Sequence, residues 1–129
     1  MATTVTLTDI SAFNTATAVT NVAATADTAD LAEEFTVTPT KRDGLLVVRI
    51  NNVSALNGTV AFSVAAGGLW AAGAAKTGTV AQGVSSDVVL EGGKYKKADG
   101  TIAITITPAS GKKLKTDHTL TIAAIQLPA

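Results

Sequence analysis

From position 34 to the C-terminus, apolar and polar residues alternate in short runs that are separated by turn residues. A period of two places successive apolar side chains on one face of a β-strand. The clearest run is 101–107, where Ile102, Ile104 and Ile106 share one parity and mostly threonines occupy the other. It follows an Asp99-Gly100 turn signal, and the pattern predicts a strand with one buried face.

Other runs predict further strands, at 35–37, 45–50, 60–64, 87–90 and 119–127. The run 45–50 is apolar on both parities, which is typical of a central strand. In the last run the apolar parity changes between Ile122 and Ile125, which predicts a β-bulge near Ala123 and Ala124. Strands recurring without helices between them indicate an all-β domain, a β-sandwich or jelly roll, over residues 32–129.

The first 31 residues are a low-complexity stretch of Thr, Ala, Val and Asn with few large side chains. Such a composition provides little apolar surface for a core. It predicts an extended N-terminal arm over 1–31, with short strand pieces at 5–7 and 18–22. Residues 26–34 are the only stretch compatible with a helical turn, capped by Asp27 or Thr28.

The 129 residues suit one domain with one core, and 47% of them are hydrophobic but only 4% aromatic. Because the chain has no cysteine, it has no disulfide or thiolate metal site, so packing or self-association must stabilise it. A net charge of zero argues against nucleic acid as a partner. No run approaches the roughly 20 apolar residues that span a bilayer, and no secretory signal is visible, so we expect no membrane partner and synthesis in a cytoplasm.

Charge is unevenly distributed along the chain. Residues 1–40 contain five acids and no base, a net of −5, whereas 41–129 contain ten bases and five acids, a net of +5. Opposite charges attract and steer association. We therefore expect Asp27, Asp30, Glu33 and Glu34 to bind the basic part of a neighbouring subunit or, equally, of the same chain.

The sequence offers little for catalysis. His118 is the only histidine, and no Gly-x-Ser-x-Gly motif accompanies it, so we interpret it as a turn residue and predict no catalytic residue. The acids at 27–34 match no known calcium loop, and a helix start explains them equally well, so we predict no metal and no cofactor. Asp87 and Glu91 flank a strand and are the candidates for a glycosidase carboxyl pair, but nothing in the sequence marks a cleft between them.

Three residues in glycine- and lysine-rich loops are candidates for partner binding. Trp70 lies in an apolar loop, 69–75, and is either the anchor of a protein contact or a plug over the end of the sandwich. Tyr95 and Lys96 lie in a basic stretch that is either solvated surface or a receptor for an acidic segment.

Four motifs resemble a known family. They are Arg49-Ile50-Asn51-Asn52, the small-residue loop 64–68, the stretch 95–101 and the closing Ala-Ala-Ile-x-Leu-Pro at 123–128. Together they are similar to head decoration, or cement, proteins of tailed bacteriophages, over residues 35–128. The resemblance implies a non-enzymatic virion protein that binds the outside of the capsid shell, often as a trimer, and reinforces it. It transfers no individual binding residue.

Two other classes of function remain as alternatives. A carbohydrate-binding or adhesin-type β-sandwich would need aromatic residues to stack on sugar rings, for which Trp70 and Tyr95 are the candidates. A small β-sandwich enzyme using Asp87 or Glu91 ranks last.

Overall fold

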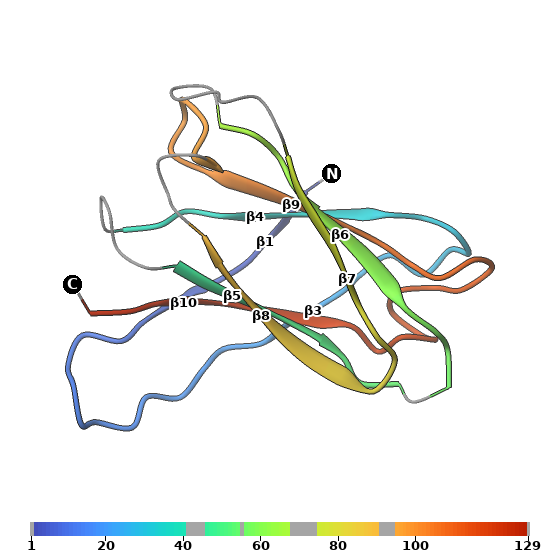
Figure 1. The fold of residues 1–129 in the computed structure, drawn as a ribbon, viewed down its shortest axis with the longest axis horizontal. Coiled ribbons are helices and arrows are strands. Elements are labelled where there is room, and N and C mark those ends of the chain that lie inside the picture. The colour runs from blue at the N-terminus through green and yellow to red at the C-terminus, as the bar shows by residue number, and fades with distance from the viewer. Residues whose placement is uncertain (1, 41–45, 55, 68–74, 91–94, 129) are drawn as a thin grey trace.

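A computed structural model describes residues 2–40, 46–54, 56–67, 75–90 and 95–128. The chain is all-β and forms two mixed sheets packed in a sandwich-like arrangement, as the sequence predicts (Figure 1). The first sheet has the order β1-β4-β9-β6-β7 and the second the order β2-β10-β5-β8, with β3 also paired to β10.

Strands of the first sheet are β1 (Thr3–Thr4), β4 (Glu33–Val37), β9 (Ile102–Thr107), β6 (Val60–Val64) and β7 (Lys76–Val80). Those of the second sheet are β2 (Leu7–Asp9), β10 (Thr121–Gln126), β5 (Leu46–Asn52) and β8 (Val84–Leu90), together with β3 (Val22–Ala23).

The eight strands from β3 to β10 form nested antiparallel pairs. β6 pairs with β7, β5 with β8, β4 with β9 and β3 with β10, so the later half of the chain runs back along the earlier half. The inner and outer pairs fall alternately into the two sheets. The chain is therefore arranged like one long hairpin whose successive strand pairs lie on opposite sides of a common core.

The core lies between the sheets and consists mainly of aliphatic side chains. Ile102, Ile104 and Ile106 of β9 are at most 1% exposed, which confirms the predicted strand and its buried parity. β5 lies between β10 and β8, which confirms its predicted central position. Phe35 and Phe62 are the large aromatic side chains of this core.

The sequence did not indicate β7. Its residues are mostly polar and exposed, and Gly78 in its middle faces the ring of Phe62 on β6. A Cβ atom at position 78 would come within 2.6 Å of that ring. The glycine therefore lets the phenylalanine ring lie over the strand and close this side of the core.

The bulge predicted at Ala123 and Ala124 is wrong. β10 pairs with β5 in continuous register from Thr121 to Gln126. Ile122 and Ala124 face the core, and Ile125 lies on the opposite face but is only 5% exposed. The change of apolar parity thus reflects burial on both faces of β10.

The first 31 residues are not confirmed as a separate extended arm. β1 runs parallel to β4 in the first sheet, β2 runs parallel to β10 in the second, and β3 pairs with β10. Val5 and Ala24 are buried in the core cluster. Residues 28–30 form a turn, and the helical turn predicted for 26–34 does not form, because Glu33 and Glu34 begin β4.

Candidate functional site

The broad outer face of the second sheet is the candidate site, and we call it the outer face. Leu46, Val48 and Ile50 of β5 point into the core, so the alternate residues of this sheet point away from it. The outer face is formed by Val47, Arg49, Asn51, Ser85, Asp87, Val89, Thr121, Ala123 and Ile125.

Strand register arranges this face in three rows. Ile125, Val47 and Val89 lie side by side and form an apolar row. Beside it Arg49 lies opposite Asp87, and beyond that Asn51 lies between Thr121 and Ser85. An apolar row next to a charged pair and a polar row is a composition suited to contact with another protein.

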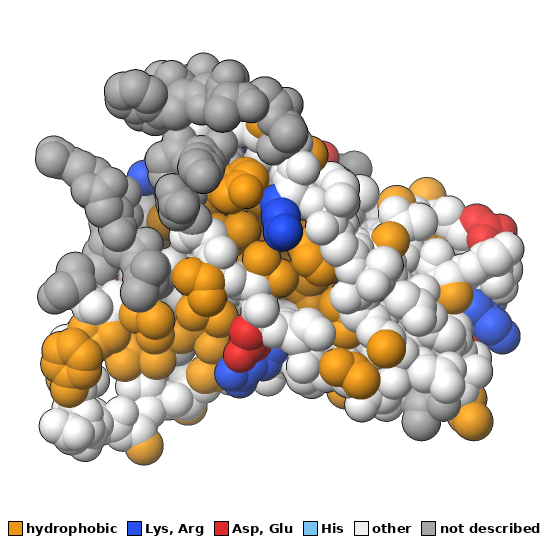
Figure 2. All heavy atoms as spheres, in the orientation of Figure 1, with side chains coloured by type: hydrophobic (Ala, Val, Ile, Leu, Met, Phe, Trp, Pro, Cys, Tyr) orange, Lys and Arg blue, Asp and Glu red, His pale blue; other side chains and the backbone are white. Residues whose placement is uncertain are grey.

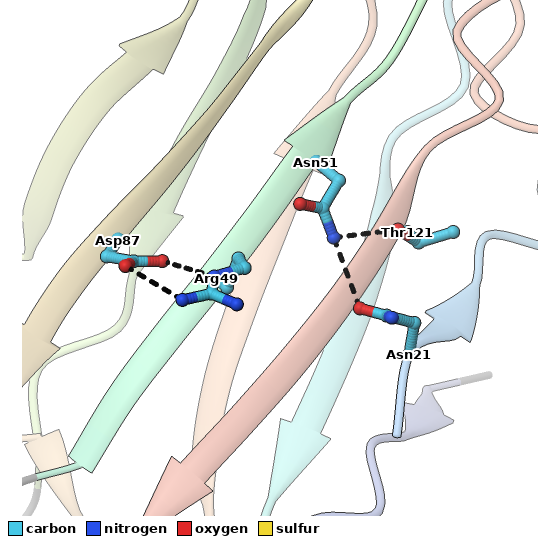
Figure 3. Close-up of polar contacts among 5 residues, drawn as sticks. All are labelled: Asn21, Arg49, Asn51, Asp87 and Thr121. Atoms are coloured by element: carbon cyan, nitrogen blue, oxygen red, sulfur yellow. Dashed lines mark hydrogen bonds and ion pairs between the residues drawn. The ribbon is translucent and has the colours of Figure 1, made fainter. Parts of the chain in front are cut away.

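Arg49 and Asp87 form a bidentate ion pair. Nε of Arg49 donates to Oδ1 of Asp87 at 2.8 Å, and Nη2 donates to Oδ2 at 3.2 Å (Figure 3). The hydrogen bonds from Arg49 hold the pKa of Asp87 below its usual value; burial opposes them, and the charge of Arg49 adds a smaller lowering. The pair joins β5 to the edge strand β8 and keeps Asp87 ionised, which is not the state of a general acid.

The polar row is tied to the N-terminal segment. Nδ2 of Asn51 donates to Oγ1 of Thr121 at 2.9 Å and to Oδ1 of Asn21 at 3.2 Å (Figure 3). The backbone N–H of Thr20 donates to Oγ1 of Thr8 on β2. Residues 20 and 21 therefore lie against the outer face at β2 and β10, while Val89 on β8 remains 60% exposed.

A hollow of about 390 Å³ lies beyond the end of β10. It is lined by Ile10, Ala12, Phe13, Asn14, Thr15, Leu127 and Pro128. Phe13 is 73% exposed although it is a large aromatic residue. Figure 2 shows hydrophobic side chains gathered in a band over this part of the molecule. The sequence did not indicate this surface, because its residues come from segments that are far apart in the chain.

The carboxylates of Asp27 and Asp30 form hydrogen bonds within the chain. Oδ1 of Asp27 accepts a hydrogen bond from the hydroxyl of Thr116, and Oδ1 of Asp30 accepts one from the backbone N–H of Gly111 at 2.6 Å. Both partners lie in the lysine-containing segment 111–116. This is the intramolecular alternative of the two left open by the sequence, and the contacts run through a hydroxyl and a backbone amide.

Glu33 and Glu34 are adjacent in β4 but have different surroundings. Glu33 is buried, and its carboxylate accepts hydrogen bonds from the hydroxyl of Thr3, from the N–H and hydroxyl of Thr25 and from the N–H of Ala26. Glu34 is exposed. The carboxylate of Glu33 thus holds the N-terminal segment to the sandwich and is already saturated with donors. Glu34 remains accessible to a partner.

Tyr95 is half-buried and packs against the hydrophobic core, and Lys96 beside it is partly exposed. Trp70 and Glu91 lie outside the described residues. The partner-binding residues predicted from the sequence are therefore not brought together in the described part of the chain: Asp27 and Asp30 contact the 111–116 segment, Glu33 is internal, and Tyr95 belongs to the core.

His118 lies at the bend that follows the turn at 114–117, as its interpretation as a turn residue expects, and its side chain is fully buried. Its Nε2 accepts the backbone N–H of Ala109 at 3.1 Å, which leaves Nδ1 to donate to Oδ1 of Asn52 at 3.1 Å. Nδ2 of Asn52 in turn donates to the carbonyls of Gly58 and Val80. Burial lowers the pKa of His118, with Asp117 partly opposing the effect. Both ring nitrogens are used to hold the fold.

In the described residues no three His, Cys, Asp or Glu side chains converge to hold a metal ion. The same residues contain no helix long and apolar enough to cross a membrane. No protein-family model matches the sequence, and a search of curated proteins finds no significant match.

Proposed function

We propose that this protein is a non-enzymatic structural component of a bacteriophage virion, made in the host cytoplasm, which binds the outer surface of the capsid shell and stabilises it. The resemblance of residues 35–128 to head decoration proteins supports this assignment. We also propose that the sandwich is a jelly roll. The nested pairing of β3 with β10, β4 with β9, β5 with β8 and β6 with β7 supports it, and jelly rolls are common in viral capsid and lectin domains.

The exposed side chain of Val89, at the β8 end of the apolar row, is the observation that carries the binding role. Val89 stands 60% exposed beside Val47, and Phe13, in the hollow with Leu127 and Pro128, is 73% exposed. Exposed Val89, next to the Arg49–Asp87 pair, gives this face an apolar side chain with a polar surround, as protein interfaces have. We propose that this face contacts the shell.

A sedimentation assay tests the proposal. The protein is mixed with purified shells of the phage that encodes it, and the shells are pelleted. We expect saturable binding, and a higher temperature of shell disruption when the protein is bound. Val89→Asp introduces a charge into the apolar row and should weaken binding at least roughly tenfold, because a desolvated unpaired charge is costly.

Thr79→Asp is a matched control, because it adds the same charge at an exposed position on β7. It should leave shell binding unchanged. Absence of sedimentation with shells, or equal loss in the two variants, contradicts the proposal. Specific binding on a glycan array would instead favour the carbohydrate-binding alternative, for which the half-buried Tyr95 provides little open ring surface.

A further inference from the structure

β8 is the longest edge strand among the described residues. The edge strands at the other margins are β1 and β2, with two and three residues, and β7, with five. β8 has seven residues, Val84–Leu90, and pairs only with β5. The backbone groups on its other side have no strand partner in the described part of the chain.

Edge strands of soluble proteins are usually protected by lysine, proline, bulges or shortness. β8 has the sequence Val-Ser-Ser-Asp-Val-Val-Leu and contains neither lysine nor proline. Its register with β5 is unbroken over all seven residues, so it contains no bulge. Its one charge, on Asp87, is neutralised by Arg49. Among the described residues, nothing therefore protects this edge against strand addition.

We propose that β8 is a self-association edge, which pairs antiparallel with β8 of a second copy of this chain across a two-fold axis at Ser86. The inference does not depend on binding to a capsid. It joins the second sheets of two copies into one continuous sheet, and it specifies a dimer where the family resemblance favours a trimer.

The side chains of β8 select the second copy and this register. With Ser86 opposite its own symmetry mate, exposed Val84 lies opposite Val88 of the partner subunit, and Asp87 lies opposite Ser85 of the partner subunit. Apolar groups then meet apolar groups, and each carboxylate faces a hydroxyl.

The alternative registers are less favourable. A pairing centred on Ser85 leaves residues 87–90 without partner residues in β8. A pairing centred on Asp87 places two carboxylates directly opposite each other, which is destabilising. A pairing centred on Val88 places Leu90 opposite Ser86 of the partner subunit and Val89 opposite Asp87 of the partner subunit, so apolar side chains meet polar ones. Charge and apolar complementarity therefore both favour Ser86 as the centre.

Sedimentation equilibrium of the full chain from micromolar to submillimolar concentration tests the association. We expect a reversible dimer, with twice the 12.9 kDa mass of the chain. Ser86→Lys places like charges opposite each other and should weaken dimerisation at least roughly tenfold. Thr77→Lys adds the same charge to the exposed edge of β7 and should leave the dimer intact. A monomer throughout, a trimer, or a dimer that Ser86→Lys does not weaken overturns the proposal.

Cysteine cross-linking tests the register independently of any loss of folding, because the chain has no native cysteine. Directly opposite residues have Cα atoms roughly 4.5–5.5 Å apart, within the range of a disulfide. Ser86→Cys should therefore form a covalent dimer on mild oxidation. Val89→Cys is the control, since two such residues lie roughly 20 Å apart in this register. Preferential cross-linking of Asp87→Cys or Val88→Cys overturns the register, and equal cross-linking at positions 86 and 89 overturns specific pairing.

Discussion

Nδ1 of His118 lies 3.1 Å from Oδ1 of Asn52, and both side chains are completely buried at one end of the sandwich. Asn52 ends β5 in the second sheet and donates to the carbonyl of Val80, which ends β7 in the first sheet. His118 also accepts the backbone N–H of Ala109, which follows β9. The two side chains thus link the two sheets by hydrogen bonds where β-strand pairing does not.

This link makes stability depend on pH. Protonation of Nε2 removes the acceptor for Ala109, and burial lowers the pKa of His118 below its ordinary value of about 6.5. Between the lowered pKa and about 6.5, the unfolded chain binds a proton that the folded chain does not. The free energy of unfolding should therefore fall as the pH drops below about 6.5, by about 1.4 kcal/mol for each unit by which the pKa is lowered.

Urea unfolding followed by circular dichroism between pH 5 and 8 measures this dependence. His118→Gln is the control, because glutamine does not titrate. The His118→Gln variant should be less stable than the wild type, and its free energy of unfolding should change little with pH across this range. A wild-type profile as flat as that of the variant contradicts the prediction.

Replacing Glu33 and replacing its neighbour Glu34 should have very different effects on stability. Glu33→Ala removes the acceptor for Thr3, Thr25 and Ala26 and breaks a set of part-buried hydrogen bonds. We expect a loss of about 3 kcal/mol in the free energy of unfolding and faster proteolysis of the N-terminal segment. Glu34→Ala, at the exposed neighbouring position, should change stability by no more than about 0.5 kcal/mol. Similar losses in both variants would show that the hydrogen bonds of Glu33 do not hold the segment.

The alternation of apolar residues was sufficient to predict the strands of the core. Ile102, Ile104 and Ile106 give a clear period of two, and the structure buries all three. β7 was missed because its residues are mostly polar and its contribution to the core is the space above Gly78. A strand that provides room for a neighbour's side chain leaves no apolar pattern in its own sequence.

Long-range polar contacts could not be predicted from the sequence, for a different reason. Arg49 and Asp87 are 38 residues apart, and His118 and Asn52 are 66 apart. Their proximity follows from strand register, which local patterns do not determine. The acids at 27–34 were recognised as a group by charge, but whether each contacts solvent, its own chain or a partner depends on the path of the N-terminal segment. Glu33 is buried because the N-terminal segment passes over it, at Thr3 and again at Thr25 and Ala26.

The ion pair on the outer face should contribute little to stability. Arg49 and Asp87 are 40% and 44% exposed, so water and salt screen their attraction. Asp87→Asn should lower the free energy of unfolding by less than about 1 kcal/mol, and the difference should shrink at 1 M salt. Because the pKa of Asp87 is lowered in the fold, the contribution is present at neutral pH and disappears as the pH falls through that lowered value. A salt-independent loss of several kcal/mol contradicts this view of the pair as a surface contact.

Gly78 and Phe62 provide a test of packing at the β7 edge. Gly78→Ala places a methyl group within 2.6 Å of the Phe62 ring, so the ring must move, and we expect a loss of about 1–3 kcal/mol in the free energy of unfolding. In a Phe62→Leu background the ring is absent, and the same substitution should be neutral or stabilising by up to about 1 kcal/mol, since alanine is favoured over glycine within a strand. Urea unfolding of the two single variants and the double variant measures the coupling. An equal cost of Gly78→Ala in both backgrounds would mean that the glycine is required by the backbone of β7 and not by the ring that lies over it.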